Sequence, residues 1–455
     1  MLDLRILSGV VVSDGAAAIH DIGIEAGRIV EVEESGRLGP ARRELDATGL
    51  HVLPGAIDVH FHCRAPSHPE RGTFESETRA AAAGGVTTIF EMPISDPACS
   101  TPEVFRQRRT LAEREANVNF ALYSGAALGP AAAAEMAAEG AIGFKLFTVT
   151  PAPDREVEFR GLWASGEPAI LDALAAVGST GLPCVIHAEN EALLSHYRSL
   201  ATEDGAAARP PIVEALAIAQ VATLAREVEA RIHIAHVTSR AALAAVRGAI
   251  AMGAAVSAET CPQYLMLDSS AVERFGGVAK IAPPLREPAD SEALWDGLGD
   301  GTLSVVASDH APFLLHEKAD VPFSVAPQGL PTVELLVPVM LDAAARGRLP
   351  LELAVSLITS APARLFGLYP EKGCIAPGSD ADLALVSLTD VFHPEPASLV
   401  TRAAGCGIVF GGMSLQARVR TTIVNGRVVY SDGNLVSSAG GRFTPGRAAA
   451  ALEPV

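Results

Sequence analysis

The sequence lacks the features that mark membrane, secreted and disulfide-rich proteins. No apolar run approaches the roughly 18 residues that a helix needs to span a bilayer. The first residues, Met1–Arg5, contain neither the basic nor the apolar stretch of a secretory signal. The cysteines are scattered without a C-x-x-C pair, which argues against a disulfide framework and a zinc ribbon. We therefore expect a cytoplasmic protein with small buried thiols at Cys63, Cys99, Cys184, Cys261, Cys374 and Cys406.

The sequence is also poor in positive charge. Its 35 Lys and Arg residues face 53 Asp and Glu residues, which gives a formal net charge of −18. Such a surface repels a phosphate backbone, so we expect no nucleic-acid partner. Apolar residues make up 49% of the 455 positions. This length and composition suit one large barrel with a smaller unit beside it.

Short β-rich segments alternate with alanine-rich segments of helical spacing. Several of the helical segments open with Pro, or with Ser or Thr before an acidic residue, as helices commonly do. Two further helices are expected near Pro331–Ala345 and Leu351–Phe366. Eight strand–helix repeats predict an α/β fold, a (β/α)₈ barrel. The alternative is a doubly wound open sheet, but no G-x-G-x-x-G follows the first strand. The expected strands are Gly55–His60, Val86–Met92, Val118–Tyr123, Ile142–Phe147, Pro183–His187, Ile232–Val237, Ala254–Glu259 and Leu303–Asp309.

The two ends of the chain differ from the middle. Residues 1–53 and 372–455 alternate apolar and polar positions, and Asn425–Gly426 is a hairpin signal. We expect these ends to pair into one small β-sandwich domain, with the barrel spanning residues 54–371. The last residues, Gly440–Val455, are expected to be loosely ordered.

Metal-binding residue types follow the expected barrel strands. The first strand ends at His60-Phe61-His62, and residues two apart on a strand face the same way. Because active sites of such barrels lie where the strands end, these positions predict a metal centre. Four other strands end at Lys145, His187, His236 and Asp309. Of the neighbouring histidines, we expect His233 to face away from the barrel interior and His310 to face away from Asp309.

Lys145 needs a separate argument, because a protonated lysine cannot bind a metal. Between Phe144 and Leu146 its charge would be poorly solvated, so its pKa should fall. A neutral amine can react with carbon dioxide to give a carbamate, whose two oxygens can bridge two cations. Alternatively, Lys145 and Asp309 form a buried ion pair. The residues alone do not decide between the carbamate and the ion pair.

The chain resembles the cyclic amidohydrolases, the group of hydantoinases (dihydropyrimidinases), allantoinases and dihydroorotases. The resemblance implies a barrel with a β-sandwich, two divalent metal ions (usually zinc), Lys145 carboxylated by CO₂, and homodimers or homotetramers. It favours the carbamate, and all six ligand positions are intact. The matching motifs are Pro54–His62, Ala82–Thr88, Gly143–Lys145, His187–Asn190, Glu259–Leu265, Ala282–Arg286, Ser308–His310 and Pro377–Leu383.

Two metals predict a mechanism for opening a cyclic amide. A water bridging the metals loses a proton near neutral pH, and the hydroxide attacks a ring carbonyl. Asp309 accepts a proton and passes it to the departing ring nitrogen, first as base and then as acid.

The resemblance also bears on the substrate. Gly84–Pro97 and Val118–Tyr123 look most like L-hydantoinases and allantoinases, which predicts a hydantoin- or allantoin-like ring. In the family, backbone groups at the positions of Cys261 and Gln328 hold the ring amide. Thr150 stands where dihydropyrimidinases carry a tyrosine that polarises the scissile carbonyl, and allantoinases tolerate this change.

Two alternatives remain from the sequence. Arg64 matches the arginine with which dihydroorotases bind their substrate's carboxylate, although Ile94 replaces their asparagine. Arg64 would otherwise form a structural ion pair. A catalytically silent relative is the other alternative, but such proteins usually lose metal ligands.

The loops Thr148–Glu167 and Ala311–Gly329 flank the expected site, and we expect them to act as lids.

Overall fold

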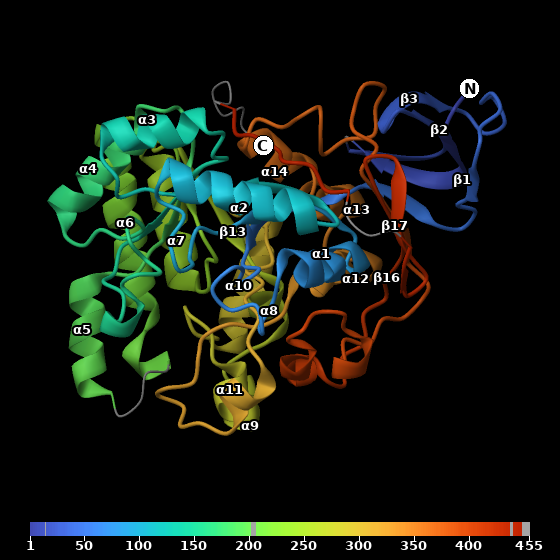
Figure 1. Cartoon of the computed structure of the whole chain (residues 1–455). Coiled ribbons are helices and arrows are strands. Elements are labelled where there is room, and N and C mark those ends of the chain that lie inside the picture. Colours follow the sequence, from blue (N-terminus) through green and yellow to red (C-terminus); the bar gives the residue numbers. More distant parts are fainter. Residues whose placement is uncertain (14, 202–205, 437–439, 448–455) are drawn as a thin grey trace.

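The strands from the two ends of the chain lie together on one side of the molecule, and the middle of the chain forms the other side (Figure 1). This computed structural model describes residues 1–13, 15–201, 206–436 and 440–447. Among these residues, no helix is both long and apolar enough to cross a membrane.

Parallel strands from the middle of the chain close into a barrel. They form a three-stranded sheet and a six-stranded sheet, which meet at Tyr123, where β8 leads directly into β9. The other edges meet where Phe61 pairs with His310 and the His62 N–H donates to the His310 carbonyl at 2.9 Å. With β8 and β9 counted as one strand, the eight-stranded barrel is confirmed. Its strands are β6 (Ala56–Phe61), β7 (Val86–Glu91), β8 (Asn119–Leu122), β9 (Ser124–Gly125), β10 (Phe144–Phe147), β11 (Cys184–His187), β12 (Ile232–Ile234), β13 (Val256–Thr260) and β14 (Val305–Val306).

Apolar side chains fill the inside of the barrel. Val59, Phe90 and Val185 are buried in one cluster with Phe366. The Tyr123 hydroxyl reaches across and donates to the Val59 carbonyl at 3.0 Å. The interior is therefore a packed core, which leaves the strand ends as the place for chemistry.

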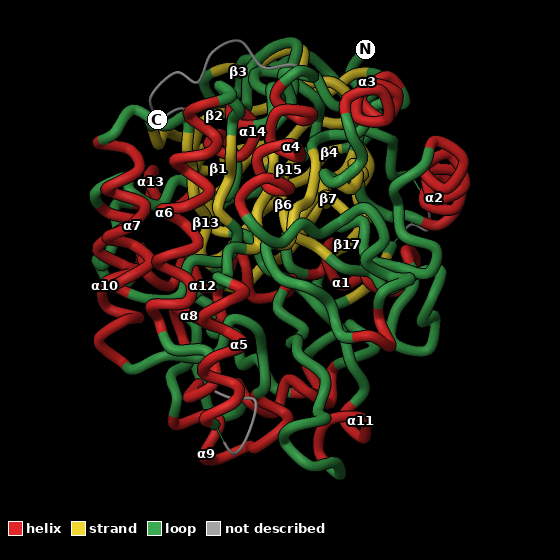
Figure 2. Tube along the Cα trace, turned by 90° about the vertical axis from the view of Figure 1, so that its left-hand side faces the viewer, coloured by secondary structure: helices red, strands yellow, loops and turns green. Residues whose placement is uncertain are grey.

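Helices cover the outside of the barrel. In the order of the expected repeats they are α1 (Phe74–Ala83), α2 (Pro102–Glu115), α3 (Pro130–Ala138), α4 (Glu167–Gly178), α6 (Pro211–Glu227), α7 (Arg240–Ala251), α10 (Pro288–Gly299) and α12 (Leu336–Ala345). Short helices missed by the sequence patterns lie in the loops after the strands: α5 (Glu191–Leu200), α8 (Pro262–Met266), α9 (Ser270–Phe275) and α11 (Leu315–Ala319). Both views place α5, α9 and α11 at one end of the molecule (Figures 1 and 2).

One predicted helix is interrupted. The helix expected over Leu351–Phe366 consists of α13 (Leu351–Ser356) and α14 (Ser360–Leu365). The break supplies acceptors to the barrel, because the Leu357 carbonyl accepts from the Val306 N–H and the Ile358 carbonyl accepts from the Ile57 N–H.

The two chain ends share one nine-stranded sheet, as expected for a composite β-sandwich. β5 pairs with both β1 and β15 and so joins the N-terminal and C-terminal parts. Asn425 and Gly426 turn between β16 and β17 with φ values of 50° and 75°, which confirms the hairpin. The domain division at residues 53/54 and 371/372 stays a prediction. The strands are β1 (Leu4–Ser13), β2 (Ala16–Glu25), β3 (Arg28–Glu33), β4 (Glu44–Asp46), β5 (His51–Pro54), β15 (Leu383–Ser387), β16 (Arg418–Val424), β17 (Arg427–Ser431) and β18 (Asn434–Leu435).

The segment 440–447 packs against the barrel, so the expectation of loose order at Gly440–Val455 is wrong for these residues. The Phe120 N–H donates to the Arg442 carbonyl at 3.0 Å, and the Thr444 N–H donates to the Phe120 carbonyl at 2.8 Å. The Phe443 ring lies 5.7 Å from the Phe120 ring. This segment therefore lies along β8, and residues 448–455 are outside the described part of the chain.

We predict that Gly441→Ala destabilises the protein. A Cβ at Gly441 would lie 1.9 Å from the Val118 carbonyl oxygen, so the backbone must move away from the barrel. The free energy of unfolding, measured in urea, should fall by about 1–3 kcal/mol. Gly440→Ala is the matched control, because a Cβ there meets nothing within 4 Å. Equal stability of the two variants would contradict the close packing of this segment.

Candidate metal centre

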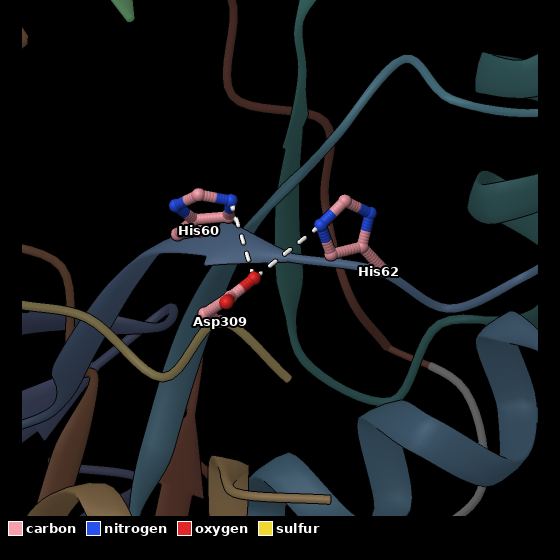
Figure 3. A group of neighbouring side chains, drawn as sticks. All are labelled: His60, His62 and Asp309. Atoms are coloured by element: carbon pink, nitrogen blue, oxygen red, sulfur yellow. Dashed lines mark ion pairs between the residues drawn. The ribbon is translucent and has the colours of Figure 1, made fainter. Parts of the chain in front are cut away.

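His60, His62 and Asp309 meet at the ends of their strands (Figure 3). The Asp309 Oδ1 lies 3.4 Å from the His60 Nε2 and 3.6 Å from the His62 Nε2. One ligand atom from each of the three residues lies within 4.8 Å of the others. Both histidines are buried, and Asp309 is half-buried. This is the geometry of a candidate metal site.

Two more predicted ligands complete the cluster. The His187 Nδ1 and the His236 Nε2 face each other at 2.9 Å. The His236 ring lies 5.3 Å from the His60 ring, which joins this pair to the first group. The fold thus brings four histidines and Asp309 into one continuous cluster from strands that are distant in the sequence.

Buried carboxylates bind the outer nitrogens of two of these histidines. The Glu259 Oε1 lies 2.5 Å from the His60 Nδ1, and the Glu189 Oε2 lies 2.8 Å from the His187 Nε2. Because an ionised carboxylate only accepts, each of these ring nitrogens must carry the proton. The inward nitrogens, the His60 Nε2 and the His187 Nδ1, therefore keep their lone pairs.

Burial keeps the imidazoles neutral, so that their ring nitrogens can bind a metal ion. Burial lowers the pKa of His62 to about 3 and lowers the pKa values of His187 and His236. Burial alone would raise the pKa of Asp309, but the electrostatic interaction with the neighbouring His60 and the hydrogen bond from His62 outweigh it and hold this pKa below its usual range. The cluster therefore combines neutral imidazoles with an ionised carboxylate.

Lys145 lies on β10 with its amine in an apolar environment. Its side chain is fully buried, and its Nζ lies 5.1 Å from the centre of the Phe147 ring. Within the described residues, this Nζ has no hydrogen-bond partner and forms no ion pair with Asp309. Burial lowers its pKa to about 8, against the opposing charges of Glu259 and Asp309. The predicted fall in pKa is confirmed, and the alternative ion pair is not formed.

This donor set fits divalent cations. Ring nitrogens of buried imidazoles face one another and a carboxylate oxygen at 2.9–3.6 Å, an arrangement that a shared cation would stabilise. Imidazole and carboxylate are common zinc ligands. The unpartnered Lys145 amine adds a position that carboxylation would turn into two further oxygen donors.

The prediction for His233 is wrong. Its Nε2 lies 3.0 Å from the Glu259 Oε2, so it shares this carboxylate with His60 inside the barrel. The period-two alternation behind the prediction fails because β12 ends at Ile234 and His236 has a φ of 38°. His310 does face away from the cluster, with its Nε2 2.9 Å from the Glu77 Oε2.

The predicted substrate-binding residues lie in different environments. Arg64 is buried with its guanidinium 4.4 Å from the centre of the Phe313 ring, and its Nε has no partner. Thr150 is exposed, and its N–H donates to the Glu191 Oε2 at 2.5 Å. The structural ion pair considered for Arg64 is absent from the described residues.

Cys261 and Gln328 come from the loops after β13 and β14. Cys261 is buried, and its carbonyl accepts from the first turn of α8, at Tyr264 and Leu265. Gln328 is half-buried beside Gly329, whose N–H donates to the Lys280 carbonyl at 3.1 Å.

Sequence reasoning missed the supporting carboxylates. Glu259 lies in the last residues of β13, so the rule that strand ends carry the chemistry could have found it. Glu189 follows His187 by two residues and also pairs with Arg209, which lies beyond α5 in the sequence. No local pattern indicates the Arg209 contact.

The chain is similar to known proteins along nearly its whole length. A family model described as "Amidohydrolase family" matches residues 51–429. An allantoinase of Rubrobacter xylanophilus is 36% identical over 460 residues, covering 97% of each chain. A dihydroorotase of Syntrophotalea carbinolica is 34% identical, covering 90% of this chain and 94% of its own. The solved L-hydantoinase (dihydropyrimidinase) from Arthrobacter aurescens aligns with a TM-score of 0.89 at 30% identity, covering 98% of this chain and 100% of its own.

We predict that Glu259→Gln weakens zinc binding about 10- to 100-fold, because His60 loses the carboxylate that fixes its tautomer and raises its basicity. Competition with a chelator measures this affinity directly. Glu334→Gln is the matched control, since Glu334 is also buried but accepts from the N–H groups of Val400 and Thr401. Equal zinc affinities in the two variants would contradict the role of Glu259.

Proposed function

Because the chain belongs to the amidohydrolase family and is a cyclic amidohydrolase, we propose that it opens the ring of a hydantoin- or allantoin-like substrate with the help of two divalent metal ions. The observation that carries this proposal is the meeting of His60, His62 and Asp309 beside the facing His187 and His236. The proposed ligands are His60, His62, Lys145, His187, His236 and Asp309.

Lys145 joins this set as a carbamate. A neutral amine attacks carbon dioxide, a nitrogen–carbon bond forms, and the nitrogen loses a proton. The buried, unpartnered Nζ and its lowered pKa support this step, because both increase the share of neutral amine. The resulting anion carries two oxygens and offsets the positive charge of the cations.

The bound cations supply Lewis-acid polarisation of the scissile carbonyl and lower the pKa of the attacking water. Asp309 accepts a proton from that water and donates it to the ring nitrogen as the carbon–nitrogen bond breaks. Its low pKa supports the first role, since the carboxylate is ionised before the attack. His60 and His187 hold their positions because Glu259 and Glu189 bind their outer nitrogens.

The substrate ring is held by backbone groups at Cys261 and Gln328 in this proposal. The exposed Thr150 provides no phenol to polarise the carbonyl, which favours hydantoin or allantoin over dihydropyrimidines. Zinc as the metal, assembly into homodimers or homotetramers, and a cytoplasmic location stay predictions.

Dihydroorotase activity is the second candidate. The unpartnered Nε of the buried Arg64 and the similar dihydroorotase favour it, because a substrate carboxylate would pair with this guanidinium. A catalytically silent relative is disfavoured, because every predicted ligand is present.

We expect ring opening of hydantoin, 5-substituted hydantoins or allantoin when these are assayed beside dihydrouracil and dihydroorotate. Each product gains a carboxylate, so proton release and chromatography both report the reaction. Hydrolysis of dihydroorotate alone would replace the first candidate by the second. No hydrolysis by zinc-loaded protein would favour the silent relative.

We predict that Lys145→Ala loses activity and much of its bound metal, because the bridging carbamate can no longer form. Short carboxylic acids such as acetate or propionate should restore part of the activity by supplying two oxygens in the space left behind. Metal analysis and steady-state rates measure both effects, with circular dichroism as the control for folding. Full activity of this variant would exclude the bridging role.

A further inference from the structure

Lys318 is a buried lysine outside the metal cluster. Its side chain has 0% exposure, and it forms no ion pair with a carboxylate in the described part of the chain. Its Nζ donates instead to the carbonyls of Lys280 at 2.9 Å and Gly329 at 2.5 Å. Burial lowers the pKa of this amine to about 7, which shows that the charge is poorly solvated, so the presence of a lysine here calls for a reason other than stability.

The two carbonyls belong to segments that are far apart in the sequence. The Lys280 carbonyl also accepts from the Gly329 N–H at 3.1 Å, so Lys318 closes a small ring of hydrogen bonds. The Lys280 ammonium donates to the carbonyls of Phe323 and Ser324 in the same loop. The loop Ala311–Gly329, expected to be a lid, is therefore tied down at two points.

The tied segment lies beside the catalytic strand end. Leu330 pairs with His310, and the Ala311 N–H donates to the Leu330 carbonyl at 2.9 Å. Gly329 has a φ of 153°, and a Cβ there would lie 2.6 Å from the Ala311 carbonyl oxygen. The backbone around Gln328 therefore has little freedom once Lys318 is in place.

We propose that Lys318 is a positioning residue for substrate: its amino group donates to the carbonyls of Lys280 and Gly329 and so fixes the backbone at Gln328 that binds the ring amide. This inference rests on the proposed function, in which Gln328 contacts the substrate. Lys318 itself touches neither the substrate nor the metal ligands. Its loss should therefore weaken binding of the ring and leave the chemical step largely intact.

The test compares Lys318→Met, which removes the amino group, with the unaltered zinc-loaded protein. KM for the best cyclic substrate should rise about tenfold, the effect of losing the two buried hydrogen bonds of the Lys318 amine, while kcat and metal content stay nearly constant. Amide hydrogen exchange over residues 326–330 should become faster. Lys318→Gln, which keeps a shorter donor, should give a smaller rise in KM and serves if the Met variant does not fold.

Lys372→Met is the matched control. Lys372 is also buried, but it pairs with Asp380 and Asp382, and Asp382 in turn binds Asn119 at the start of β8, away from the candidate metal centre. It should lose thermal stability without a change in KM or in exchange at 326–330. The same rise in KM in both variants, or unchanged exchange in Lys318→Met, would overturn the proposal. Because exchange is measured without substrate, faster exchange with no cyclic amide hydrolysed would contradict the proposed function alone.

Discussion

The candidate metal centre depends on buried carboxylates that bind the outer nitrogens of its histidines. Glu259 and Glu189 each accept a hydrogen bond from the outer N–H of one imidazole, so the inward nitrogens of His60 and His187 present lone pairs. These lone pairs lie close to the Asp309 carboxylate and to the other imidazoles in a buried environment, where electrostatic interactions are strong. The packed barrel holds these groups together, and cations are the partners that turn the arrangement into a stable one.

The backbone conformation contributes as much as the types of side chain to the geometry of the candidate metal centre. His236 and Asp309 have positive φ values, 38° and 46°, as does Arg64 at 66°. Non-glycine residues in this region cost of order 1–3 kcal/mol each and persist only where the surroundings fix them. At His236 and Asp309 this conformation turns the side chain back over the barrel mouth. This turn explains why strand alternation failed to place His233 and His236 correctly relative to each other.

The two ends of the barrel serve different purposes. At the start of β8, the segment 440–447 packs beside Phe120, and Lys372 pairs with Asp380 and Asp382. At the other end, Lys318 donates to two carbonyls, lies 5.8 Å from the centre of the Phe313 ring, and holds a loop next to the strand that carries Asp309. The environment of Lys372 is suited to stability, and that of Lys318 is suited to shaping a binding surface. In such barrels, one end commonly serves stability and the other carries the active site.

The sequence alone determined the eight strands and the residues at their ends, because strand length, alternation and helix starts are local patterns. It also placed His60, His62, His187, His236 and Asp309 at one rim, since the carboxyl ends of parallel barrel strands must meet there. Tertiary structure decided the contact of Glu259 with His60, the break between α13 and α14, and the packing of residues 440–447. These features join residues that are far apart in the chain. No local pattern in the sequence shows which distant group will pack against a buried polar group, because only the folded structure brings the two together.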